Sequence, residues 1–115
     1  MLFQRIHGES LKNIFADIPK NVNGELFETI LQAASLRVER IVSYGHCSPK
    51  DYWYDQDENE WVILLKGSAG LRLENNGETI TLMPGDFIHI EKHLRHRVEW
   101  TDAGQETIWL AVHYS

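Results

Sequence analysis

The sequence predicts an all-β domain, and two observations carry this prediction. From Leu36 onwards, apolar residues alternate with smaller or more polar ones at a period of two, which is the spacing of a strand with one buried face. Clusters of Gly, Pro, Asn and Asp separate these runs and predict turns. At least seven short strands in 115 residues favour a sandwich or a closed barrel.

The expected strands follow one another along the chain. The alternating runs are Leu36 and Val38, Leu71 and Leu73, Ile80 and Leu82, Val98 and Trp100, and Ile108, Leu110 and Val112. The wholly apolar run 61–65 and the run 87–90, which is apolar except for His89, complete the set. Turns are predicted at Gly67-Ser68, Asn75-Asn76-Gly77, Pro84-Gly85-Asp86 and Asp102-Ala103-Gly104.

The first third of the chain has a different pattern. After Asn23, a suitable N-cap residue, helical spacing is found for Leu26, Phe27, Ile30, Leu31 and Ala34. The pattern predicts a short amphipathic helix whose apolar stripe packs on the barrel or on a second subunit. We therefore expect one domain, in which residues 1–35 form an N-terminal arm with this helix and residues 36–115 form the barrel.

Charge and hydropathy exclude two classes of partner. The net charge is −6 and the sequence pI is near 5.4, so phosphate backbones and anionic membranes are disfavoured. The longest apolar runs have five residues, far fewer than the roughly 20 that cross a bilayer. We expect neither a nucleic acid nor a membrane as a partner.

Cysteine usage and the first residues bear on the compartment. The only cysteine, Cys47, excludes an intrachain disulfide and fits a reducing environment. The first residues lack the apolar core of a signal peptide. A cytoplasmic location is therefore expected.

Glu60 and His96 are the residues most indicative of a site. Glu60 opens an apolar strand that ends on Gly67, and His96 follows the strand that opens after Gly85. If Glu60 faces inward, it needs a cation or a hydrogen-bond donor, because an unpaired buried carboxylate is costly; the alternative is a solvated strand end. His96 shares the parity of Val98 and is predicted to face inward, the alternative being a surface histidine.

This spacing resembles the cupin superfamily, in particular small single-domain cupins of the conserved-barrel (cupin 2) type. Glu60 and Gly67 match the end of the first cupin motif, and Gly85 and His96 match the two ends of the second. The resemblance covers roughly residues 48–114. It implies a jelly-roll β-barrel, and with the short helix the expected fold is an all-β cupin barrel with a short N-terminal helix.

The resemblance also implies a divalent metal, which could be Fe, Mn, Zn or Ni. Its ligands would be Glu60 and His96, completed by one or two of His46, Gln56 and Tyr54. The chain departs from the family here, because Tyr54 and Gln56 stand where the first motif has paired histidines. Neither is a good zinc ligand, so the absence of any metal is an open alternative.

Aromatic residues next to this segment suggest a wall for a small polar metabolite. Tyr52, Trp53 and Tyr54 precede an acidic loop and are predicted to line the mouth of the cavity, together with Trp61 and His93. The alternative is that the aromatic residues fill the core of a small barrel. An aromatic wall with a few polar groups suits a small organic ligand.

Two functions are therefore kept open. The first is a cupin that binds a divalent metal and a metabolite, with a dioxygenase, decarboxylase or sugar isomerase/epimerase activity implied only by the resemblance. The second is a metal-free cupin that acts as a small-molecule binding or regulatory module. A homodimer is expected in both cases, since small barrels leave apolar edges and faces that a partner can cover.

Overall fold

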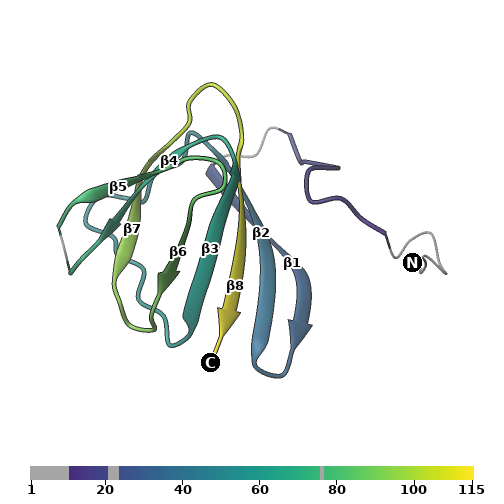
Figure 1. Cartoon of the computed structure of the whole chain (residues 1–115). Helices are drawn as coiled ribbons and strands as arrows, with labels where there is room; N and C mark the ends of the chain where they lie inside the picture. Colours follow the sequence, from purple (N-terminus) through teal and green to yellow (C-terminus); the bar gives the residue numbers. More distant parts are fainter. Residues whose placement is uncertain (1–10, 21–23, 76) are drawn as a thin grey trace.

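In the computed structural model, which describes residues 11–20, 24–75 and 77–115, two antiparallel sheets face each other (Figure 1). The five-stranded sheet has the order β1 (Gly24–Ala33), β2 (Leu36–Tyr44), β8 (Thr107–Tyr114), β3 (Asn59–Lys66), β6 (Phe87–Ile90). The three-stranded sheet has the order β5 (Thr79–Leu82), β4 (Ala69–Leu73), β7 (His96–Thr101). The all-β prediction is confirmed, and a jelly-roll barrel fits this arrangement.

The predicted N-terminal helix is wrong. Residues 24–33 form β1, which pairs with β2 along its length, and no helix occurs among the described residues. The register of this pair shifts between Thr29 and Leu31, as at a β-bulge. One extra residue changes the phase of the alternation, so two strand segments of opposite phase together imitate helical spacing. Because β1 joins the five-stranded sheet, residues 24–33 of the predicted arm belong to the barrel.

The hydrophobic core lies between the two sheets. Val62 and Leu64 of β3 face Leu71 and Val98 of the smaller sheet, and all four are at most 7% exposed. Burial alternates along β3, so that Glu60 shares the inner face with Val62 and Leu64. The strand that positions Glu60 is therefore anchored by two core residues.

Two glycine turns lie beside this strand: Gly67 is in the turn from β3 to β4, and Gly85 is in the turn from β5 to β6. Gly67 has φ +87°, and a Cβ there would lie 2.5 Å from Thr107 Oγ1 and 2.9 Å from Thr107 Cα. Only glycine fits such a position. At the second turn Gly85 has φ +95°, and its N–H donates to the Leu64 carbonyl at 2.7 Å. The turns predicted at both glycines are confirmed.

The described part of the N-terminal arm lies against β2. The guanidinium of Arg40 donates to the carbonyls of Ile14 (3.1 Å) and Ala16 (2.7 Å), and the Tyr44 hydroxyl donates to the Pro19 carbonyl at 2.7 Å.

None of the described segments is a helix that is long and apolar enough to cross a membrane.

Candidate functional site

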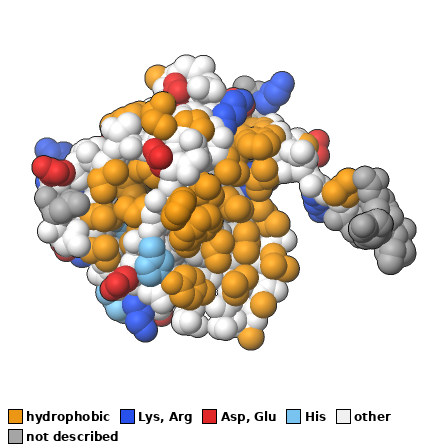
Figure 2. All heavy atoms as spheres, in the orientation of Figure 1, with side chains coloured by type: hydrophobic (Ala, Val, Ile, Leu, Met, Phe, Trp, Pro, Cys, Tyr) orange, Lys and Arg blue, Asp and Glu red, His pale blue; other side chains and the backbone are white. Residues whose placement is uncertain are grey.

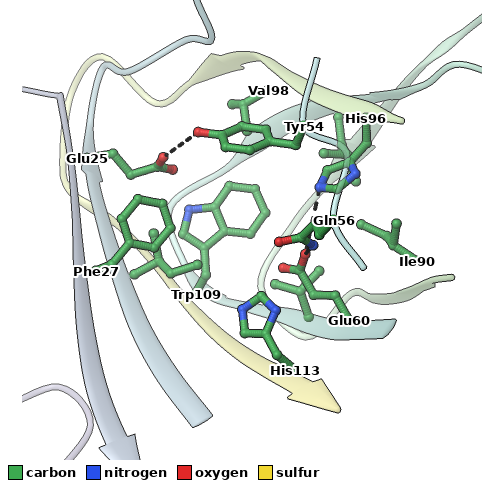
Figure 3. A pocket seen from close by; sticks show the side chains of 13 residues that line it. Glu25, Phe27, Tyr54, Gln56, Glu60, Ile90, His96, Val98, Trp109 and His113 are labelled. Atoms are coloured by element: carbon green, nitrogen blue, oxygen red, sulfur yellow. Dashed lines mark hydrogen bonds and ion pairs between the residues drawn. The ribbon is translucent and has the colours of Figure 1, made fainter. Parts of the chain in front are cut away.

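A pocket of about 70 Å³ opens between the two sheets, enough space for several water molecules. Its apolar lining consists of Phe27, Ile41, Val62, Leu71, Ile90, Val98 and Trp109. Its polar lining consists of Glu25, Tyr54, Gln56, Glu60, His96 and His113 (Figure 3). Neither lysine nor arginine is among these lining residues, so the polar groups are mainly acceptors and acids.

Glu60, Gln56 and His96 form one cluster in this pocket. Gln56 Nε2 donates to Glu60 Oε1 at 2.8 Å, and His96 Nε2 lies 3.7 Å from the same oxygen. Because a carbonyl can only accept, His96 Nδ1–H donates to the Leu94 carbonyl at 3.1 Å. His96 Nε2 is thereby turned towards Glu60. The structure brings the two motif residues together, and both are buried.

Backbone pairing explains how Gln56 reaches this cluster. Tyr54 and His96 exchange two backbone hydrogen bonds, of 2.7 and 3.1 Å, which fix the loop before β3 against β7. Successive residues along an extended segment point to opposite sides, so residues two positions apart share one side. Tyr54 and Gln56 therefore enter the pocket together.

Glu25 is the centre of a second cluster. The hydroxyls of Ser43 and Tyr54 each donate to its carboxylate at 3.3 Å, and His46 Nε2 lies 3.5 Å away. Burial is the largest cause that raises the pKa of Glu25, and the nearby His46 opposes it. Burial and the Glu25 charge also raise the pKa of the Tyr54 phenol. Tyr54 is therefore kept as a neutral O–H donor.

His113 also lines the pocket, although its place in an apolar strand favours a hydrogen-bonded core or surface histidine over a ligand. It is the Cα partner of Glu60 on the adjacent strand and is 4% exposed. Its Nε2 lies 3.0 Å from Glu39 Oε1, and Glu39 in turn pairs with Arg37 at 3.1 Å. The alternation along β8 indicates that His113 faces inward, because Trp109, Ala111 and His113 lie two residues apart and are all buried on the inner face.

Four residues that were expected to bind ligand do not line the pocket. Trp53 is surrounded by the guanidinium groups of Arg72, Arg95 and Arg97, each 5.8 or 5.9 Å from its ring. The others are Tyr52, which is 41% exposed, His93, which pairs with Asp55, and Trp61, whose ring contacts Phe87. Trp53 and Trp61 each neighbour an inward-pointing residue, so alternation turns them away from the pocket.

Residues 40–113 match the protein family described as Cupin domain. The chain belongs to the cupin family. Among curated proteins, no sequence matches this cupin. Among solved structures, a protein of Ralstonia eutropha JMP134 named "putative mannose-6-phosphate isomerase" is 44% identical, with a TM-score of 0.88, over 91% of this chain and 97% of that one.

Two more distant structures share the fold. An RmlC-like cupin of Methanocaldococcus jannaschii is 15% identical with a TM-score of 0.65, over 85% of this chain and 86% of that one. FeII HppE is 17% identical with a TM-score of 0.68, over 85% of this chain and 54% of that one. At these identities the likeness concerns the fold alone.

The donor groups fit poorly to the metal that the family implies. Among the described residues, no three of His, Cys, Asp and Glu converge as a metal site. The Gln56 amide offers Glu60 its N–H, not its oxygen, and the Tyr54 hydroxyl donates to Glu25. His46 lies beside Glu25 in the other cluster. Of the predicted ligands only Glu60 and His96 remain, short of the three protein ligands of a typical catalytic zinc site.

Proposed function

We propose that this cupin binds a small organic molecule between its two sheets without a resident metal. One observation carries the proposal, namely that seven apolar and six polar side chains converge on one pocket. An apolar wall with a few placed polar groups is the usual composition of a small-molecule site. The Gln56–Glu60 hydrogen bond supports the metal-free form, because it satisfies the carboxylate that a metal would otherwise neutralise.

A sugar phosphate, as in the name of the Ralstonia protein, is less well supported as the ligand. A phosphate needs arginine, lysine or a cluster of backbone N–H groups, and no lysine or arginine lines the pocket. The two lining carboxylates, Glu25 and Glu60, would repel a dianion. We therefore do not extend that activity to this chain.

Binding is tested with a fragment library and a variant that fills the pocket. Val98→Phe adds a ring to the buried wall and should abolish fragment binding measured by ligand-observed NMR, whereas Val112→Phe, on the partly exposed face of β8, should leave it intact. Binding that survives Val98→Phe, or no hit with the wild type, contradicts the proposal.

Metal analysis separates this proposal from the metal-dependent alternative. The alternative is favoured by one observation, the 3.7 Å approach of Glu60 and His96. Protein purified without an affinity tag and supplemented with Fe, Mn, Zn or Ni should hold far less than one metal per chain. A stoichiometric metal that is lost in His96→Ala would instead establish a metal-binding cupin.

We also propose that the protein forms a homodimer. Ile30 and Leu31 on the edge strand β1 are 51% and 57% exposed, and Phe87 is 64% exposed. On the face shown in Figure 2, hydrophobic side chains gather over the five-stranded sheet. Leu31→Lys should shift the mass measured by light scattering towards that of a monomer. Leu11→Lys, on a similarly exposed leucine of the arm, should not.

A cytoplasmic location stays a prediction and is supported by the single cysteine, which fits a reducing compartment. The dioxygenase, decarboxylase and sugar isomerase/epimerase activities belong to the metal-dependent alternative, and we propose none of them for the metal-free pocket.

A further inference from the structure

His113 has one ring nitrogen without a partner in a buried position. Its Nε2–H donates to Glu39 at 3.0 Å, because a carboxylate can only accept. Its Nδ1 is buried and has no hydrogen-bond partner among the described residues. In the neutral ring this nitrogen carries a lone pair, since Glu39 fixes the proton on the opposite nitrogen. A buried acceptor in this state is costly until a donor reaches it.

The ring lies in the wall of the pocket. His113 projects into it next to Glu60 and close to Trp109 (Figure 3). Arg37 pairs with the second oxygen of Glu39 at 3.1 Å, so the carboxylate that orients the ring is itself held in place. The free nitrogen is therefore a built feature of the site and is oriented by two further residues.

The surroundings of this nitrogen select for positive charge. Glu25 and Glu60 contribute two carboxyl groups, and neither lysine nor arginine lines the pocket to balance them. The aromatic rings of Phe27, Tyr54 and Trp109 form part of the same wall. Carboxylates and aromatic faces both attract organic cations.

We infer that the ligand is a small protonated amine and that His113 Nδ1 accepts one of its N–H groups. This inference rests on the proposed binding function and specifies its ligand class. The ammonium group supplies the missing donor to His113, and its charge balances Glu60. The apolar part of the ligand lies against Trp109 and the aliphatic wall.

The inference is tested with three probes that share one ring: benzylamine, benzyl alcohol and benzoate. At about pH 8 the amine is still protonated and histidines are mostly neutral. Isothermal titration of the wild-type protein should give the tightest binding for benzylamine. His113→Leu should weaken benzylamine by about tenfold or more, since hydrogen bonds to charged groups are the strong ones, and should weaken benzyl alcohol by a smaller factor, because its O–H can make only a neutral hydrogen bond to Nδ1.

His89→Leu is the matched control. His89 is an exposed histidine on β6 that contacts Tyr114 and does not line the pocket, so all three affinities should remain at wild-type values. A loss of benzylamine binding in both variants would overturn the assignment to His113.

A second measurement does not depend on the folding of a variant. Nitrogen-15 spectra of the wild-type histidine rings should show His113 Nδ1 unprotonated, with a shift on addition of benzylamine but not of benzoate. Wild-type preference for benzyl alcohol or benzoate would overturn the inference and leave small-molecule binding intact. If no probe and no library fragment binds, the proposed function fails as well.

Discussion

Glu25 and Glu60 share one pocket but are held in different ways. Glu60 is the second residue of β3, which is paired on both sides, and accepts a 2.8 Å hydrogen bond from Gln56. Glu25 lies on the edge strand β1 and accepts two 3.3 Å hydrogen bonds, from Ser43 and Tyr54. Hydrogen bonds to charged groups are typically shorter than 3 Å, so Glu25 is the less well compensated carboxyl.

The difference shows where this pocket departs from its family. Gln56 stands where the cupin motif has a histidine, and its amide satisfies Glu60 directly. The hydrogen bonds of the motif cluster are therefore largely made within it, although Glu60 still lines the pocket. The groups with weak or missing hydrogen-bond partners lie elsewhere, at Glu25 and at the unpartnered nitrogen of His113. We therefore expect Glu25 and His113 to determine which ligand binds more than the motif residues do.

The largest effect is expected from Gln56→Leu. The change removes the short hydrogen bond and leaves Glu60 Oε1 with His96 at 3.7 Å. Loss of the partner of a buried charged group costs about 1–3 kcal/mol. Urea denaturation at neutral pH should show this decrease in the free energy of unfolding.

Gln105→Leu is its control. The amide of Gln105 donates to Asp102 at 3.1 Å on an exposed loop, and surface changes usually stay within about 0.5 kcal/mol. Equal losses in the two variants would mean that Glu60 does not depend on Gln56.

A smaller effect is expected from Tyr54→Phe. This variant keeps the ring that stacks on His96 and removes the hydroxyl that donates to Glu25. The cost should be about 0.5–1.5 kcal/mol, as for a typical hydrogen bond, and the metal content should not change. Tyr52→Phe, on an exposed neighbour outside the pocket, should be close to neutral. A loss of bound metal in Tyr54→Phe would place the phenol on a metal and contradict the metal-free proposal.

Much of the fold could be predicted because turn chemistry is local. Gly67 and Gly85 need positive φ angles, and such positions are visible as glycines in the sequence. The first strand could not be predicted, because the irregularity between Thr29 and Leu31 breaks the period of two. A bulge is set by pairing with β2, a partner that the local pattern does not reveal.

The site could be predicted only where the motif was present. Glu60 and His96 do meet, as the spacing required. His113 was missed because both faces of β8 are apolar: the alternation seen at Leu110 and Val112 belongs to the partly exposed outer face, while Trp109 and Ala111 face inward. The alternation of Val98 and Trp100 predicts that both side chains lie on one face. The register shift in the β4–β7 pair instead leaves Trp100 39% exposed.

The smallest effect is expected from Glu25→Gln, and its dependence on pH is the informative part. Burial raises the pKa of Glu25 above its usual value in spite of His46, so the folded protein binds this proton more tightly than the unfolded chain. Stability from this group is therefore present below the unfolded pKa of about 4.3 and is lost as the pH rises through the higher folded pKa. Glutamine keeps the shape of the side chain and carries no charge.

The melting temperature of Glu25→Gln should accordingly match that of the wild type at about pH 4 and exceed it slightly at neutral pH. Glu28→Gln is the control, because Glu28 lies on the same strand and pairs with Arg40 at 2.7 Å outside the pocket; it should give no gain at neutral pH. If Glu25→Gln instead lowers the melting temperature as the pH rises, the ion pair with His46 outweighs burial, and Glu25 is as well compensated as Glu60.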